Sequence, residues 1–207
     1  MSMNKKNMIR GCLFFIIIAG SIMIWQRYTF HKIQQNKIHQ NLKNNLIRFH
    51  VRANSDSSFD QACKLKVRDA VISKVSQMMD KADTKEEAFD ILKKQKDSIK
   101  NTAQEILKKE GVIQKVKVHF VQEKFPEKTY GQYTFPEGIY DALRIDLGEA
   151  KGHNWWCVLY PNLCFLDTTN AVVPDKGKKQ LKQVLTEEEY SKVTANTKFK
   201  IGWYFWK

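Results

Sequence analysis

The chain opens on an apolar run and continues with patterned segments. Residues 11–25 carry no charge, and basic residues flank them on both sides: Lys5, Lys6, Arg10, Arg27, Lys32 and Lys37. A helix over this run spans about 23 Å, short of a hydrocarbon core of roughly 30 Å, but flanking basic side chains can reach the interface. We therefore predict a signal peptide or signal-anchor over residues 1–27, since a buried core helix does not need a charged, terminal start.

The segment that follows is polar. Residues 31–45 are rich in Gln, Asn and Lys and contain neither Gly nor Pro. We interpret residues 28–45 as a polar linker or stalk. The first strand pattern begins after it, so residues 46–207 are predicted to form one domain.

Alternation and helix-start signals predict the elements of this domain. Residues 47–53 alternate apolar with basic side chains, which predicts a half-buried strand with Arg48, His50 and Arg52 on its solvated face. Capping boxes at 58–61 and 84–87 predict two main helices, the second continuing to residue 109. Further strands are expected over 115–120, 143–147 and 155–159. The order of these elements predicts an α+β fold with a mixed or antiparallel sheet.

The end of the chain is less distinctive. Residues 170–207 form a tail in which 186–189 resemble a helix start and 198–206 an aromatic strand. We expect that strand to join the core, with contact at a membrane interface as the alternative.

Charge and composition narrow the class of partner. Lys and Arg total 35 against 22 Asp and Glu, a net charge of +13. This excess raises the possibility of an anionic partner such as lipid or wall polymer, with a merely solvated basic surface as the alternative. No zinc-finger spacing and no basic segment with interleaved aromatics is present, so we expect no nucleic-acid partner.

Cys157 and Cys164 flank six residues that can form a hairpin. Pro161 would fall at the third position of a symmetric two-residue turn, which disfavours that turn and favours a longer or cis-proline loop. A disulfide closing this loop would contribute about 2.5 kcal/mol in the chain-entropy treatment. The alternative is two buried, reduced thiols.

Other chemistry receives little support from the sequence. Cys157 could pair with a histidine (His50, His119 or His153), but no spacing fixes their proximity. The acid pairs Asp56–Asp60 and Asp141–Asp146 could serve a wall hydrolase, although Asp56 also suits a turn. No metal-ligand spacing occurs. We therefore predict no catalytic residue, no metal and no cofactor.

Several motifs point to one family. They are Arg48-Phe-His-Val-Arg-Ala-Asn-Ser-Asp-Ser57, Leu65-Lys-Val-Arg-Asp-Ala-Val71, Tyr130-Gly131, Pro136-Glu-Gly-Ile-Tyr-Asp-Ala-Leu-Arg144 and Gly152-His-Asn-Trp-Trp-Cys-Val-Leu-Tyr-Pro161. With them the chain resembles the stage II sporulation protein R family over about residues 46–166.

The resemblance implies a signalling protein without chemistry of its own. Family members are exported across the forespore membrane into the intermembrane space. There they activate a membrane-bound aspartic protease of the mother cell, which trims a sigma-factor precursor. The segment over residues 1–27 would secrete or anchor the domain.

Candidate partner contacts come from these motifs, from the basic strand face and from two adjacent tryptophans. Trp155 and Trp156 should point to opposite faces of a strand, so one can join the core while the other is exposed, or both are buried. The candidates are Arg48, His50, Arg52, Asn54, Asp56, Arg68, Asp69, Tyr130, Trp155 and Trp156.

Overall fold

A computed structural model describes residues 5–130, 132–164 and 175–195. The chain separates into two compact units, Met1–Gln40 and Asn41–Lys207. Helix α1 (Lys5–Asn45) accounts for the first unit and contributes its last residues to the second. The predicted stalk over 28–45 is therefore helical.

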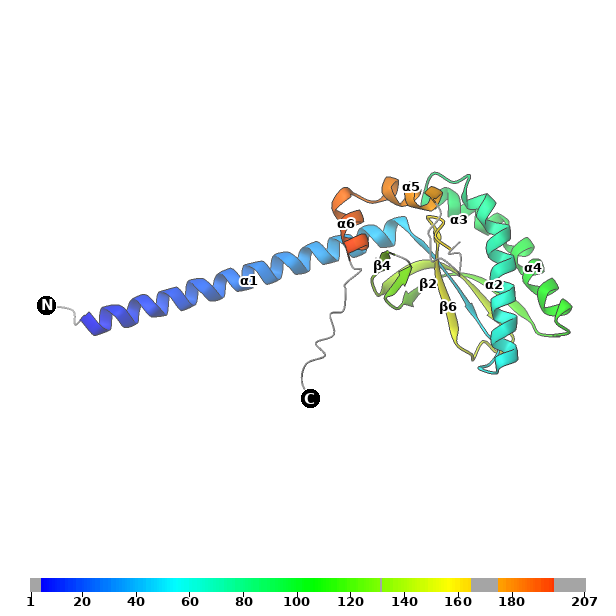
Figure 1. The fold of residues 1–207 in the computed structure, drawn as a ribbon, viewed down its shortest axis with the longest axis horizontal. Helices are drawn as coiled ribbons and strands as arrows, with labels where there is room; N and C mark the ends of the chain where they lie inside the picture. Colours follow the sequence, from blue (N-terminus) through cyan, green and yellow to red (C-terminus); the bar gives the residue numbers. More distant parts are fainter. Residues whose placement is uncertain (1–4, 131, 165–174, 196–207) are drawn as a thin grey trace. The chain divides into compact units, whose positions relative to one another are not determined.

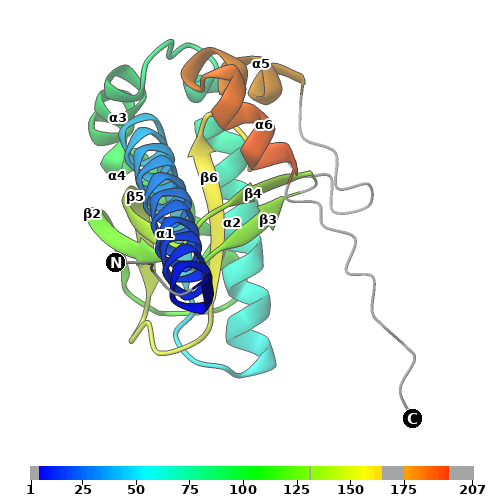
Figure 2. The same ribbon diagram turned by 90° about the vertical axis from the view of Figure 1, so that its left-hand side faces the viewer.

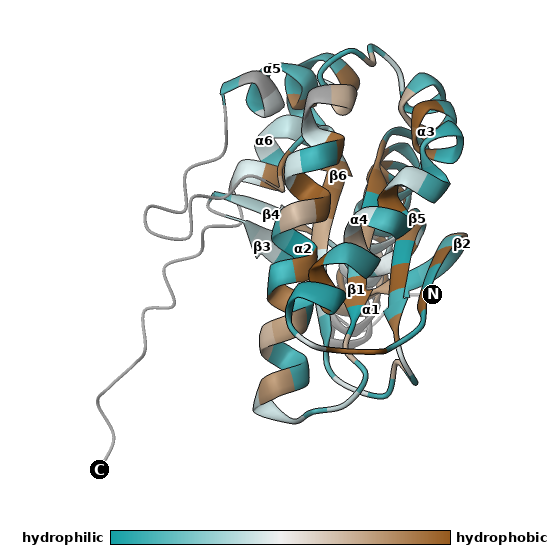
Figure 3. Cartoon of the chain, turned by 90° about the vertical axis from the view of Figure 1, so that its right-hand side faces the viewer, coloured by the Kyte–Doolittle hydropathy of each residue, from teal (hydrophilic) through white to brown (hydrophobic). Residues whose placement is uncertain are grey.

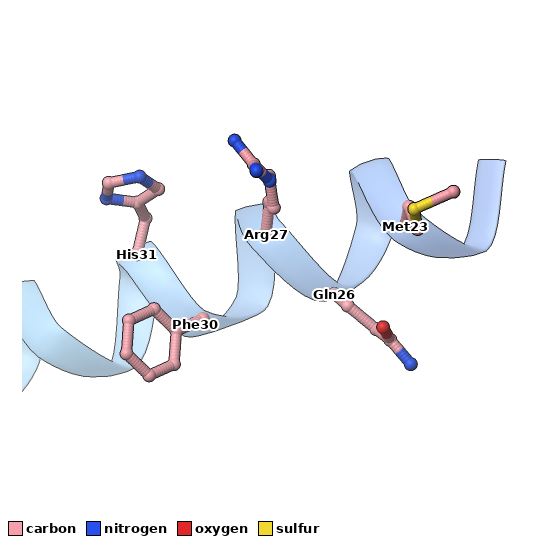
Figure 4. A pocket seen from close by; sticks show the side chains of 5 residues that line it. All are labelled: Met23, Gln26, Arg27, Phe30 and His31. Carbon is pink, nitrogen blue, oxygen red and sulfur yellow. The ribbon is translucent and has the colours of Figure 1, made fainter. Parts of the chain in front are cut away.

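The described part of α1 contains one stretch that is long and apolar enough to cross a membrane. Its large apolar side chains, from Leu13 to Trp25, are exposed. Signal peptides meet the same criterion, so the finding is consistent with a signal peptide or a signal-anchor. At the end of this stretch an open recess lies on the helix surface (Figure 4), lined by Met23, Gln26, Arg27, Phe30 and His31.

Six strands and five helices make up the described part of the second unit beyond α1. In chain order they are β1 (Ile47–Arg52), α2 (Ser58–Met79), α3 (Lys85–Lys94), α4 (Lys96–Lys109), β2 (Val116–Phe125), β3 (Lys128–Tyr130), β4 (Tyr133–Phe135), β5 (Gly138–Leu147), β6 (Asn154–Tyr160), α5 (Asp175–Val184) and α6 (Glu187–Ala195).

The main sheet is mixed. Its strand order is β2-β5-β1-β6, and β1 runs parallel to β5 but antiparallel to β6. Strand β2 pairs with β5 in the antiparallel sense, while β3 and β4 form a separate hairpin. The predicted α+β class with a mixed sheet is confirmed.

Helices α2, α3 and α4 cover one face of this sheet (Figures 1 and 2). The strands supply alternate apolar side chains to that face, and Figure 3 shows hydrophobic residues on the strands behind α2 and α4. Buried residues at the centre of this core include Phe49, Val51, Val67, Val71, Ile99, Ala103, Leu143 and Ile145. Burial of this apolar stripe supplies the main driving force for the two-layer arrangement.

Side-chain caps begin α2 and α3, although the cap of α2 is Ser57, one residue before the predicted capping box at 58–61. The Ser57 hydroxyl accepts a hydrogen bond from the Asp60 amide (3.1 Å), and the Thr84 hydroxyl accepts one from the Glu87 amide (3.2 Å). The predicted continuous helix over 84–109 is wrong, because the chain leaves helical geometry at Gln95 (φ −96°, ψ 9°). The interruption divides it into two helices, each of which buries its own apolar residues.

The tail contains one predicted and one unpredicted helix. Helix α6 follows a reciprocal capping box in which Glu189 and Thr186 exchange hydrogen bonds of 3.3 and 2.9 Å. Helix α5 was not predicted from the sequence. The predicted aromatic strand over 198–206 lies outside the described residues.

Candidate functional site

Strand β1 is more buried than its alternating pattern indicates. Arg48 and His50 are fully buried, and only Arg52 on that face is half-buried. The prediction of a solvated basic face is therefore wrong for the first two residues. Aromatic rings from β2, β4 and β5 cover this end of the face.

Arg48 lies among three aromatic rings. Its guanidinium carbon is 4.6 Å from the Phe125 ring centroid, 5.1 Å from that of Tyr140 and 5.8 Å from that of Phe135. Its Nε donates to the Cys157 carbonyl (3.1 Å), and its Nη2 donates to the Tyr130 hydroxyl (3.4 Å). No ion pair among the described residues includes Arg48.

The buried guanidinium thus contacts the faces of aromatic rings and two neutral hydrogen-bond acceptors. Its Nη1 is buried and makes no hydrogen bond within the described chain. Burial raises the pKa of Tyr130, although the nearby Arg48 charge acts in the opposite direction. Arg48 and Tyr130, both candidate contacts, therefore form a structural pair beneath the surface.

His50 links the centre of the sheet to β6. Its ring stacks on Trp156 with centroids 4.6 Å apart and planes inclined by 3°, and its Nε2 lies 3.1 Å from a Glu123 carboxylate oxygen. Burial lowers the pKa of His50 to about 4, because desolvation outweighs the attraction of Glu123. His50 is consequently neutral near pH 7.

Charges continue across this face of the sheet in compensated pairs. Arg52 contacts Asp146 through two hydrogen bonds of 2.7 and 2.9 Å. Arg144 lies 3.0 Å from Glu123 and 3.3 Å from Asp146. Arg52 and Arg144 therefore each have an acidic partner on this face.

The tryptophans point to opposite faces, as predicted. Trp155 meets Phe49 of the core edge-to-face (5.9 Å), and the Arg68 guanidinium lies 4.9 Å above its ring. Arg68 also pairs with Asp69 at 2.7 Å. Trp156 packs on the other face, and both tryptophans are half-buried.

Hydrogen bonds join the loop after β1 to the first turn of α2 and to the segment before β2. The buried Asp60 carboxylate accepts from the Ser55 hydroxyl (2.6 Å), the Asn54 amide (2.9 Å) and the Gln114 amide (3.1 Å). These bonds lower the pKa of Asp60. Asn54 also accepts from the Glu149 backbone (2.9 Å), which brings in the loop between β5 and β6.

Asp56 and His153 form the exposed part of this cluster. One Asp56 carboxylate oxygen accepts the His153 backbone amide (2.6 Å) and contacts the ring Nδ1 (2.5 Å). The two hydrogen bonds lower the pKa of Asp56. Lys64 donates to the His153 carbonyl (3.0 Å) and so ties α2 to the same loop. We refer to Asn54–Asp60, Ile113–Gln114 and Gly148–His153 as the loop cluster.

Two apolar side chains accompany the loop cluster. Phe59 is 55% exposed and Ile113 is fully exposed. They directly precede Asp60 and Gln114, which are hydrogen-bonded to each other. Sequence reasoning missed both, since Phe59 was assigned only to a capping box. Apolar groups exposed beside a fixed polar network are typical of protein-binding surfaces.

Gly152 permits the close approach of two loops, which yields a stability prediction. A Cβ at this position would overlap the Ser55 carbonyl. We expect Gly152→Ala to destabilise the domain by about 2–4 kcal/mol, since backbone must move. The matched control is Gly111→Ala, where φ is +73° but no atom lies within 4 Å; it should cost only about 1 kcal/mol. Urea unfolding measures both, and equal losses would contradict the tight loop packing.

Cys157 and Cys164 are free and buried. Both thiols point toward the Val158 carbonyl oxygen, at Sγ–O distances of 3.6 Å for Cys157 and 3.0 Å for Cys164. The Tyr160–Pro161 peptide is cis, which confirms the expected departure from a two-residue turn. The disulfide itself stays a prediction.

The hydrolase alternative gains no support from the acid pairs. Asp141 lies 2.5 Å from the Lys85 ammonium, and Asp146 is held by Arg52. Hydrogen bonds lower the pKa values of Asp56 and Asp60. Burial acts to raise the pKa values of Asp141 and Asp146, but hydrogen bonds and cationic neighbours outweigh it, so both are lowered as well. A general acid needs a raised pKa instead.

The described residues also give no support to a metal site or to a cysteine nucleophile. Within the described residues no group of three or more His, Cys, Asp and Glu side chains could hold a metal ion. Cys157 belongs to the core cluster on the helix-covered face, whereas His50 packs on the other face against Trp156. The structure does not bring these two residues together as a nucleophile and base.

Comparisons with known proteins agree with the motifs. The family profile described as "Stage II sporulation protein R" matches residues 43–170. The chain is 35% identical over 193 residues to the stage II sporulation protein R of Bacillus subtilis (strain 168), covering 92% of this chain and 85% of that protein. No solved structure matches the chain.

Proposed function

Because the chain belongs to the stage II sporulation protein R family, we propose that it is an exported signal that activates a membrane-bound aspartic protease of the mother cell. The activated protease would trim a sigma-factor precursor. The chain would act by binding and would have no chemistry of its own. Its domain would act from the intermembrane space, secreted or anchored by the N-terminal segment.

The loop cluster is the observation that carries this proposal. Motif residues that are distant in sequence, such as Asp56 and His153, meet there and remain exposed. The bonds to Asp60 fix the loops, so little conformational entropy is lost when a partner binds. Phe59 and Ile113 offer apolar contacts beside this polar network. A rigid surface of this composition suits a protein partner.

Activation would follow from differential binding. If the loop cluster binds the active form of the protease more tightly than the resting form, the protease population shifts by that difference in affinity. The candidates Arg48, His50 and Tyr130 are buried, so we assign them to the packing of the sheet rather than to contact with a partner.

Precursor trimming in a non-sporulating host tests the function. The full chain would be co-expressed with a sporulation aspartic protease and its sigma-factor precursor, and cleavage followed by immunoblot. Cleavage should require the full chain, and a chain lacking residues 1–27 should fail because it is not exported. No cleavage by a folded, exported chain would overturn the proposal.

Substitution of Phe59 tests the binding surface. We expect Phe59→Asp to reduce precursor cleavage by at least about tenfold, because a charge replaces an apolar contact. Ile139→Asp is the matched control, since Ile139 is also 55% exposed but lies at the opposite end of the sheet, where β5 begins. It should leave cleavage near the wild-type level. Equal effects of the two substitutions would rule out the loop cluster as the contact surface.

A further inference from the structure

The turn after β6 brings two buried thiols to one backbone oxygen. The Sγ atoms of Cys157 and Cys164 lie 3.6 and 3.0 Å from the Val158 carbonyl oxygen. The two sulfur atoms are therefore at most 6.6 Å apart, the sum of 3.6 and 3.0 Å. Burial raises the pKa of Cys164, and a hydrogen bond with the Cys157 thiol adds to this shift.

This turn is packed from several sides. The Cys157 carbonyl accepts the Arg48 guanidinium, and the Leu163 amide donates to Val158 (3.3 Å). The Asn162 amide side chain donates to the Ser76 hydroxyl of α2 (2.9 Å), and its backbone amide donates to Gln180 of α5 (3.3 Å). The turn therefore connects β6 with α2 and α5.

We propose that Cys157 and Cys164 are a disulfide-forming pair, oxidised by thiol–disulfide exchange when the domain reaches an oxidising compartment. The inference rests on the proposed export only for the compartment. The pairing itself rests on the position of the two thiols.

The exchange requires an oxidant that carries a disulfide, either a thiol oxidoreductase or a small-molecule disulfide. One cysteine thiolate attacks the oxidant's disulfide and releases one thiol, and the second cysteine then displaces the other thiol. Both S–H protons leave, one S–S bond forms in the protein, and the oxidant takes up two electrons as it becomes two thiols.

Burial sets the time at which the bridge forms. Because the thiolate is the attacking species, the raised pKa and the buried position of Cys164 make the folded dithiol slow to react. The bridge therefore forms before the turn has packed against α2 and α5. Once closed, it restrains the turn that carries Asn162.

Peptide mapping tests the pair directly. The full chain would be refolded in detergent with glutathione disulfide, alkylated without reduction and digested with trypsin. The peptide over residues 152–176 should be unalkylated and lighter by two hydrogen atoms. Cys63 is the internal control: it is also buried and free, lies in the separate peptide 53–64, and should be alkylated after denaturation. Alkylation of both Cys157 and Cys164 would overturn the proposal.

Stability measurements give a second readout. Oxidation should lower the unfolding equilibrium constant by about 60-fold, as expected for a loop of this length. Reduction, Cys157→Ser and Cys164→Ser should each remove that gain, whereas Cys63→Ser should keep it. A gain that survives in Cys157→Ser would contradict the pairing.

These outcomes are independent of the protease assay. A bridge without precursor cleavage would leave the pairing intact and remove the proposed function. Cleavage by a chain whose two thiols stay reduced after refolding and after export would leave the proposed function intact and overturn the pairing.

Discussion

Arg48→Ala is expected to destabilise the domain by about 3–5 kcal/mol, the range for truncating a large buried side chain. The substitution removes the guanidinium from the rings of Phe125, Phe135 and Tyr140, and it leaves the Cys157 carbonyl without its donor. Urea unfolding of the full chain in detergent, followed by tryptophan fluorescence, would measure the loss.

Arg48→Met separates volume from charge. Methionine fills much of the same space and removes a buried charge that has no carboxylate partner in the described chain, so its cost should be smaller, about 1–3 kcal/mol for the acceptors left unpaired. A methionine variant as unstable as the alanine variant would show that the charge, rather than the packing, holds the three rings. An alanine variant within about 1 kcal/mol of wild type would contradict the buried position of Arg48.

Acidification is expected to destabilise the domain between about pH 6.5 and pH 4. His50 has a folded pKa of about 4, below the usual histidine pKa of 6.5, so in this interval the unfolded chain binds more protons than the folded chain. Stability therefore rises with pH across the interval and is fully present above it. At 1.36 kcal/mol per pH unit the contribution is about 3 kcal/mol.

Unfolding free energies measured from pH 7.5 to 4 would test this slope. His50→Phe keeps an aromatic ring to pack against Trp156 and has no titrating group, so the slope should largely disappear. His119 makes a further contribution in the same direction, because burial lowers its pKa as well. His119→Gln should remove only that part. A slope unchanged in His50→Phe would show that other groups carry the pH dependence.

The sequence predicted those helices and strands whose signals lie within a short stretch of neighbouring residues. The predicted caps Thr84 and Thr186 each precede a helix, and the cap of α2 lies one residue before the predicted box at 58–61. The alternation after Ile47 corresponds to β1. The mixed sheet followed from the order of strands and helices. These features depend on residues within a few positions of one another.

The features that were missed depend on residues far apart. Burial of Arg48 results from Phe135 on β4 and Tyr140 on β5, and a three-residue strand such as β4 has no periodic signal. The loop cluster requires the parallel pairing of β1 with β5, which places their carboxyl ends side by side. A sequence signal did exist for the charged face, since Arg144 and Asp146 alternate on β5 and lie opposite His50 and Arg52.

The position of β1 also determines when the sheet can assemble. A chain that emerges from a ribosome or an export channel presents its N-terminal end first, so β1 is released long before either of its neighbours. Its parallel partner begins to pair only at Asp141, and its antiparallel partner extends to Tyr160. Until then the apolar residues of β1 have no strand beside them, and closing so long a loop makes folding slow. The central strand of the sheet therefore stays unpaired until residues up to about 160 have been released, whichever channel the chain leaves.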